Sequence, residues 1–228
     1  MVDIERIRSG VPGLDNIISG GIPKNNLVVV SGDPGSGKTI LCMEFIYQGA
    51  KTYGENGVFV SLEESKEDII RLASLFGWDF EALIKQKKME IVTIDLYDFD
   101  QLKDVIEDTI ARVGAKRIVI DPGVIFKLYF NKELEARKKI LELGKMLKES
   151  NCTAIITNEF NNKDGDLFGL EEYVADGAII LFHKKIKERF VRSVEVIKMR
   201  GTKISEKTHP VIISKQGVEI LYKEEMYE

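Results

Sequence analysis

The octapeptide GDPGSGKT at residues 32–39 constrains this chain more than any other segment does. It follows the apolar run LVVV at residues 27–30, whose valines favour a strand. The run ILCMEFI at residues 40–46 comes next and indicates a helix. The pattern G-x-x-x-x-G-K-T between a strand and a helix is typical of a loop that binds phosphate groups. A glycine-rich turn could match the pattern by chance, but the strand and helix around it argue against that alternative.

Each residue type in this loop suits contact with a polyphosphate. Glycines allow positive φ angles and a close approach of the backbone, and successive N–H groups at a helix start form a nest for an anion. Lys38 is expected to contact the β- and γ-phosphates, and the hydroxyl of Thr39 to coordinate Mg²⁺. The positions expected to bind the nucleotide here are Gly35, Ser36, Gly37, Lys38, Thr39 and Ile40.

Composition narrows the class of protein. The 228 residues are 44% hydrophobic and no linker divides them, so we expect one domain spanning residues 1–228. The net charge of −4 argues against a global attraction to nucleic acid or to anionic membranes, although it leaves room for a local basic patch. No signal-peptide pattern and no membrane-spanning apolar run is found, so we expect the cytoplasm. Cys42 and Cys152 lack metal-ligand spacing and are interpreted as reduced core thiols.

Apolar runs alternate with helical periods along most of the chain. Strand-like runs occupy residues 57–62, 91–94, 117–121, 154–157 and 178–182, and helical spacing occurs at 69–76, 102–113 and 136–147. Apolar strands separated by helices predict a parallel sheet covered on both faces. Residues 190–222 show only strand-like segments, which predict an antiparallel extension at one edge. The predicted fold class is α/β, a mostly parallel sheet flanked by helices with C-terminal antiparallel strands.

Carboxylates follow two of these strands, at the edge where parallel sheets bind ligands. Asp121 ends the strand at 117–121 in a Walker B pattern, and a carboxylate there would support the Mg²⁺ shell. An Asp that caps the next turn is the alternative. Glu63 and Glu64 end the strand at 57–62, where one Glu can orient the attacking water and the other can face the metal. The alternative is that both cap the helix beginning near Ser65, and the residues do not decide between them.

A group of cations lies on a strand near the C-terminus. A period of two places Arg192, Val194, Val196, Lys198 and Arg200 on one strand face. The two cations at the strand end could contact a polyphosphate, in the same chain or across a subunit boundary. A solvated edge strand whose charges oppose aggregation is the alternative.

Polar residues and a long segment follow another strand. One of the polar side chains of Thr157, Asn158 and Glu159 could sense the γ-phosphate, and the polar segment 160–174 is typical of either a functional or a plain surface loop.

Several segments resemble the KaiC-like branch of the RecA family of P-loop ATPases. They are GVPGLD at residues 10–15, GGIP at 20–23, SLEES at 61–65, FGWD at 76–79, EEYVAD at 171–176 and KMRGT at 198–202. The match runs in order through nearly the whole chain, and the double Glu together with KMRGT is specific to this branch. The resemblance implies a RecA-like P-loop core.

The resemblance also implies roles for individual residues. Glu63 and Glu64 would be the catalytic pair beside Lys38, and Glu63 would join Thr39 and Asp121 around Mg²⁺.

Further positions take their expected contacts from the same resemblance. Phe76 would lie against the adenine base. The segment Lys198, Met199, Arg200 and Gly201, with Arg192 behind it, would contact the nucleotide of a neighbouring subunit. In that family six subunits form a ring with ATP at each interface, which implies a homohexamer that binds ATP and Mg²⁺, with the segment 160–174 facing the channel.

The chain departs from the family pattern at a few positions. Ile204 stands where a His is frequent, and Pro122 begins a segment where Ser-Leu-Thr is frequent. No Ser-Thr pair before Glu171 matches the autophosphorylation site of KaiC, so a clock kinase is not supported.

Three functions are therefore compared. The leading one is an ATP-hydrolysing homo-oligomer. The second is a nucleotide-dependent signalling or scaffold protein with negligible turnover and a protein partner still to be identified, which Ile204 and Pro122 modestly favour. The third is a recombination-related DNA-binding ATPase, against which the net charge and the lack of a basic stripe argue.

Overall fold

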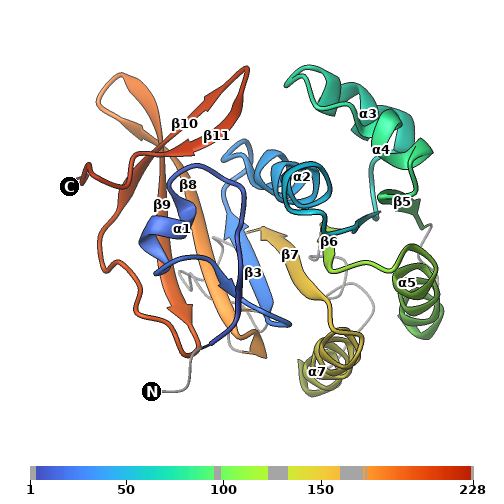
Figure 1. Cartoon of the computed structure of the whole chain (residues 1–228). Helices are drawn as coiled ribbons and strands as arrows, with labels where there is room; N and C mark the ends of the chain where they lie inside the picture. The colour runs from blue at the N-terminus through green and yellow to red at the C-terminus, as the bar shows by residue number, and fades with distance from the viewer. Residues whose placement is uncertain (1–3, 95–98, 123–132, 160–171, 173, 227–228) are drawn as a thin grey trace.

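The chain folds around one nine-stranded sheet (Figure 1). The computed structural model describes residues 4–94, 99–122, 133–159, 172 and 174–226, and the side chains of all of these except residue 133. From one edge to the other the strands are β11 (Gly217–Ile220), β10 (His209–Ser214), β9 (Arg189–Met199), β8 (Gly177–Ile186), β3 (Leu27–Gly32), β7 (Thr153–Glu159), β6 (Arg117–Asp121), β4 (Gly57–Ser61) and β5 (Met89–Thr93). The six strands from β8 to β5 pair in parallel, and β8, β9, β10 and β11 pair with one another antiparallel. The predicted parallel sheet with a C-terminal antiparallel extension is confirmed.

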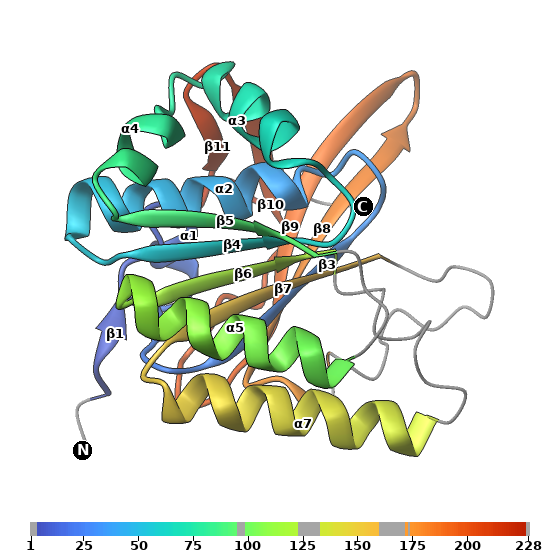
Figure 2. The same cartoon turned by 90° about the vertical axis from the view of Figure 1, so that its right-hand side faces the viewer.

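Helices cover both faces of the sheet. One face carries α2 (Lys38–Gln48), its π-helical continuation η1 (Gly49–Tyr53), α3 (Lys66–Ser74) and α4 (Phe80–Lys85), and the other carries α5 (Phe99–Val113) and α7 (Glu133–Glu149) (Figure 2). The N-terminal segment adds α1 (Leu14–Ile17) and the two-stranded sheet of β1 (Arg6–Ile7) and β2 (Ile22–Pro23).

The apolar run of β3 is continuous because both of its faces are buried. Val28 and Val30 belong to the core cluster on the α2 side, whereas Val29 belongs to the cluster on the α5 and α7 side. A strand covered by helices on both faces loses the alternation of apolar and polar residues. The two predicted core thiols fit this layout, since Cys42 and Cys152 are both free and buried.

The register of the strands places the predicted acidic residues together. Ser61 pairs with Asp121, and Gly32 pairs with Glu159, so the carboxyl ends of β4, β6, β3 and β7 meet at one edge. The phosphate loop leaves β3 at this edge and enters α2 directly.

One sequence prediction about β9 is wrong. The strand was expected to hold Arg192, Val196 and Lys198 on one face, but the pairing shifts from Ile179↔Val196 to Ala178↔Lys198. This irregularity adds one residue to β9 and reverses the faces beyond it. Val196 therefore packs in the cluster on the α2 side, whereas Lys198 pairs with Ala178 on the opposite face.

Candidate functional site

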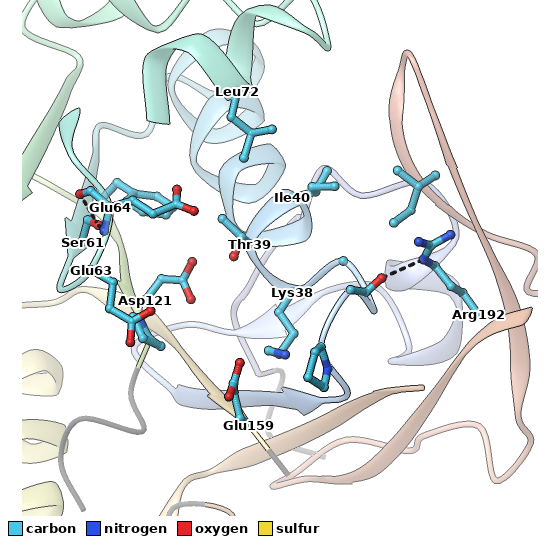
Figure 3. Close-up of a pocket in the computed structure, with 16 residues that line it drawn as sticks. Lys38, Thr39, Ile40, Ser61, Glu63, Glu64, Leu72, Asp121, Glu159 and Arg192 are labelled. Atoms are coloured by element: carbon cyan, nitrogen blue, oxygen red, sulfur yellow. Dashed lines mark hydrogen bonds between the residues drawn. The ribbon is translucent and has the colours of Figure 1, made fainter. Parts of the chain in front are cut away.

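A pocket of about 670 Å³ opens at the carboxyl edge of the sheet (Figure 3). The predicted site residues that line it are Gly35, Gly37, Lys38, Thr39, Ile40, Glu63, Glu64, Asp121 and Arg192. They come from the phosphate loop, from the ends of β4 and β6, and from β9. The structure thus brings together residues that lie up to 157 positions apart.

The phosphate loop has a backbone that requires glycine. Gly35 and Gly37 adopt φ angles of 74° and 104°, which favour residues without a Cβ atom. A Cβ at Gly37 would also lie 2.6 Å from Cδ1 of Ile213. The buried hydroxyl of Ser36 has no hydrogen-bond partner among the described residues. An unpartnered buried hydroxyl beside a nest of backbone N–H groups fits a loop built to receive an anion.

Lys38 lies within its own loop. Its Nζ donates hydrogen bonds to the carbonyl oxygens of Gly32 (2.9 Å) and Asp33 (3.0 Å). Burial lowers the pKa of Lys38, while the carboxylates of Glu159 and Asp121 act in the opposite direction. The ammonium group is thereby held at the centre of the pocket (Figure 3).

Asp121 sits at the tip of β6 opposite Thr39. Burial raises the pKa of Asp121, and hydrogen bonds with Thr157 and Thr39 oppose that rise. A hydroxyl and a carboxylate side by side are oxygen ligands of the kind that Mg²⁺ takes, together with water and phosphate oxygens. Across the described ranges, no group of three or more His, Cys, Asp or Glu side chains is placed to hold a metal by itself. The donor set therefore fits a metal held jointly with a nucleotide.

Glu63 and Glu64 face the pocket, and the helix cap comes from another residue. The side chain of Ser65 caps α3 by accepting a hydrogen bond from Asp68 N. Ser61 Oγ donates to the carbonyl oxygen of Glu64 (2.7 Å) and accepts from its backbone N–H (3.0 Å). Burial raises the pKa of Glu64, and the charges of Asp121, Asp68 and Glu63 raise it further.

The antiparallel extension supplies a wall of the same pocket. Arg192 Nε donates to the carbonyl oxygen of Gly35 (3.0 Å), and Ile213 of β10 packs beside Gly37. Arg192 therefore contacts its own phosphate loop. Glu159, one of the three polar residues predicted at the end of a sheet strand, also lines the pocket. Ile213 and Leu72 line it as well, and no pattern in the sequence marked them as site residues.

Phe76 lies in the turn that follows α3 and stacks on Trp78, with ring centroids 4.8 Å apart. It is not among the described residues that line the pocket, whereas Leu72 of α3 is. Its contact with adenine stays a prediction.

The KMRG segment lies at the end of β9 that is away from the pocket, beside the first residue of β8. Met199 pairs with Gly177 at the start of β8, and Arg200 Nη1 forms an ion pair with Asp176 at 3.2 Å. Burial and the charge of Arg200 lower the pKa of Lys198. Gly201 follows with a φ angle of 70°. Arg192 and Lys198 are six positions apart on β9, about 20 Å of extended strand, so Lys198 and Arg200 do not belong to the pocket of their own chain.

A buried polar network lies beneath the phosphate loop. Ser31 Oγ donates to Glu172, and Asn158 Nδ2 donates to the same carboxylate oxygen at 3.1 Å. Asn158 is thus linked to the strand that leads into the loop. Most of the polar segment at 160–174 lies outside the described residues, as does the segment at 123–132.

The fold and the site define a P-loop nucleotide-binding protein of the RecA-like class. The family model described as "ATPase: KaiC" matches residues 7–225, and the chain belongs to this family.

Relatives of two kinds match the chain. A UPF0273 protein of Methanocaldococcus jannaschii is 36% identical over 94% of this chain and 96% of its own length. The circadian clock oscillator protein KaiC of a Nostoc species is 34% identical over 95% of this chain, which spans 44% of that protein. The crystal structure of a KaiC-like protein from Pyrococcus horikoshii matches with a TM-score of 0.87 and 37% identity, over 96% of this chain and 99% of that one. Within the described residues no helix is long and apolar enough to cross a membrane.

Proposed function

We propose that this protein is a Mg²⁺-dependent ATPase whose nucleotide site is completed by a second copy of the chain. The observation that carries the proposal is the convergence of Lys38, Thr39, Asp121 and Glu64 on one pocket. Membership of the KaiC ATPase family supports nucleotide binding.

Each pocket residue would have its own role in phosphoryl transfer. Mg²⁺, when bound, neutralises charge on the β- and γ-phosphates. Thr39 and Asp121 would hold it, the latter through water, with Glu63 nearby. Lys38 would exchange its loop carbonyls for phosphate oxygens and stabilise the charge that develops in the transition state.

Glu64 is our choice for the residue that orients the attacking water. The Ser61 hydroxyl bonds both the N–H and the carbonyl oxygen of Glu64. The Glu64 carboxylate extends toward Thr39, whereas Glu63 lies beside Asp121 (Figure 3). A carboxylate that accepts a hydrogen bond from water aligns that water for attack.

We infer a second copy because two cations that were expected to contact the nucleotide, Lys198 and Arg200, do not line the pocket of their own chain. Lys198 and Arg200 lie at the end of β9 that is away from the pocket. They would contact the phosphates bound by a neighbouring copy of the chain, as an arginine finger does. A head-to-tail contact of this kind closes into a ring, for which we propose six copies.

Phosphate release by wild-type protein and by Lys38→Ala tests the site. We expect Lys38→Ala to lose at least about 100-fold in kcat/KM, while Lys85→Ala on the exposed face of α4 keeps wild-type turnover. Glu64→Gln should lower kcat with ATP affinity retained, and more strongly than Glu63→Gln does. Unchanged hydrolysis by Lys38→Ala would overturn the assignment. A wild-type protein that binds ATP without turnover would support the signalling or scaffold function instead.

A further inference from the structure

The hairpin that joins β8 to β9 extends beyond the rest of the sheet (Figure 2). We define the hairpin tip as residues 184–190, all seven of which are exposed. Its arms pair from Lys184↔Val191 to Ile186↔Arg189. A two-stranded ribbon that stands away from a sheet is accessible from both faces.

The hairpin tip concentrates positive charge in a chain that is acidic overall. It carries Lys184, Lys185, Lys187 and Arg189 against the single acid Glu188, whereas the whole chain has a net charge of −4. None of these four cations forms an ion pair with a carboxylate in the described part of the chain. Such a cluster attracts anions locally without a global field.

An exposed aromatic ring accompanies the cations. Phe190 is 66% exposed and pairs across the ribbon with Lys185. The centroid of its ring lies 5.0 Å from that of the His183 ring. An aromatic face beside cations is the combination on which the bases of a single nucleic acid strand stack while the phosphates are neutralised.

The base of the hairpin, at residues 181–183, is hydrogen-bonded to the phosphate loop. Asp33 N donates to the carbonyl oxygen of Leu181 (3.2 Å), and His183 N donates to Asp33 Oδ2 (2.9 Å). Together with the bond from Arg192 to Gly35, these contacts hold the hairpin in a fixed position beside the pocket.

We propose that the hairpin tip binds single-stranded nucleic acid through Phe190 and Lys185, which share one face of the ribbon, and through Lys187 at its turn. An acidic polypeptide would use the cations but leave the ring in water, so the exposed Phe190 favours a strand with bases. The net charge that argued against nucleic acid is an average, and it does not describe this ribbon.

The test is the salt dependence of binding to a labelled oligothymidylate of about 20 nucleotides, followed by fluorescence anisotropy between about 50 and 200 mM NaCl. The double variant Lys185→Glu with Lys187→Glu should weaken binding at least about tenfold and reduce the slope of log K against log salt by about 1.4. Phe190→Ala should weaken binding about tenfold without changing the slope.

The matched control changes the net charge by the same amount elsewhere. Lys85→Glu with Lys145→Glu reverses two exposed lysines on α4 and α7 and should leave affinity and slope within about twofold of wild type. The proposal is overturned if this control weakens binding as much as the tip variant does, if the wild type does not bind the oligonucleotide, or if it binds only a duplex or only polyglutamate.

Discussion

Glu44 has an almost entirely buried carboxyl group. It lies on α2, one turn beyond the phosphate loop, and is 2% exposed. Its Oε2 accepts a hydrogen bond from Val218 N at 2.8 Å, and Gly217 leaves no room for a Cβ between Glu44 and Trp78. Burial raises the pKa of Glu44 to about 7, and the Val218 bond offsets only part of that rise.

This residue predicts a pH-dependent stability. Between about pH 4.5 and pH 7 the unfolded chain releases the Glu44 proton while the folded chain keeps it, so the free energy of unfolding falls as pH rises. Above the folded pKa both states are ionised, and the loss levels off at about 3 kcal/mol. Glu44→Gln keeps an acceptor for Val218 N, and it should gain stability relative to wild type as pH rises to about 7.

Urea unfolding at a series of pH values measures the difference between the two proteins. Glu81→Gln, an exposed change on α4, serves as the control and should follow wild type at every pH. A constant difference between Glu44→Gln and wild type over this range would contradict the prediction.

Sequence reasoning at the residue scale found the groups whose roles follow from a local pattern. Lys38 and Thr39 were predicted because both belong to the local pattern of the phosphate loop, and both line the pocket. Glu44 was missed because its environment comes from β11, 174 positions away. No periodicity along α2 shows that one acidic side chain points inward.

At the scale of elements, Arg117 joins segments that are distant in the sequence. Its side chain is wholly buried at the start of β6 and pairs with Glu55 at 2.5 Å. It also donates to the carbonyl oxygens of Arg8 (2.7 Å) and Phe45 (2.8 Å), which belong to the N-terminal segment and to α2. Its guanidinium lies 4.6 Å from the centre of the Phe45 ring.

Arg117→Ala should therefore lower the free energy of unfolding by about 3–5 kcal/mol, because it leaves Glu55 and three carbonyl oxygens without their guanidinium donor. Chemical denaturation gives the value. Arg112→Ala is the matched control, since Arg112 pairs with Glu90 at an exposed position and its removal should change stability only slightly. Equal effects of the two substitutions would rule out the structural role of Arg117.

The elements themselves were largely predictable, and their irregularities were not. Apolar runs and helical periods correctly indicated β4, β6, β7, α5 and α7. The extra residue in β9 has no signal in the sequence, because a strand with a bulge has the same composition as a strand without one. Because of that extra residue, the side chain of Lys198 lies on the opposite face of the sheet from the one predicted.

At the scale of the whole molecule, the sheet order determines which residues can meet. The sequence indicated a parallel sheet, but it did not show that β6 lies between β4 and β7. That order places Asp121 beside both Ser61 and Thr157. The length of β9, rather than the strand order, separates Arg192, which contacts the phosphate loop, from Arg200, which follows the far end of that strand.

Because Arg192 and Arg200 lie far apart, we propose that each nucleotide site is shared between copies of the chain. If so, Lys38→Ala and Arg200→Ala inactivate different halves of the same interface. Each variant alone should hydrolyse ATP negligibly, although each should assemble to the wild-type mass in the presence of ATP and Mg²⁺.

Mixing the two inactive variants before assembly, with phosphate release as the readout, shows whether two copies of the chain share one site. In an equal mixture about a quarter of head-to-tail interfaces join an intact Lys38 to an intact Arg200, so up to about a quarter of wild-type activity should return. If no mixing ratio restores activity while light scattering shows that both variants assemble, the site is not shared between copies.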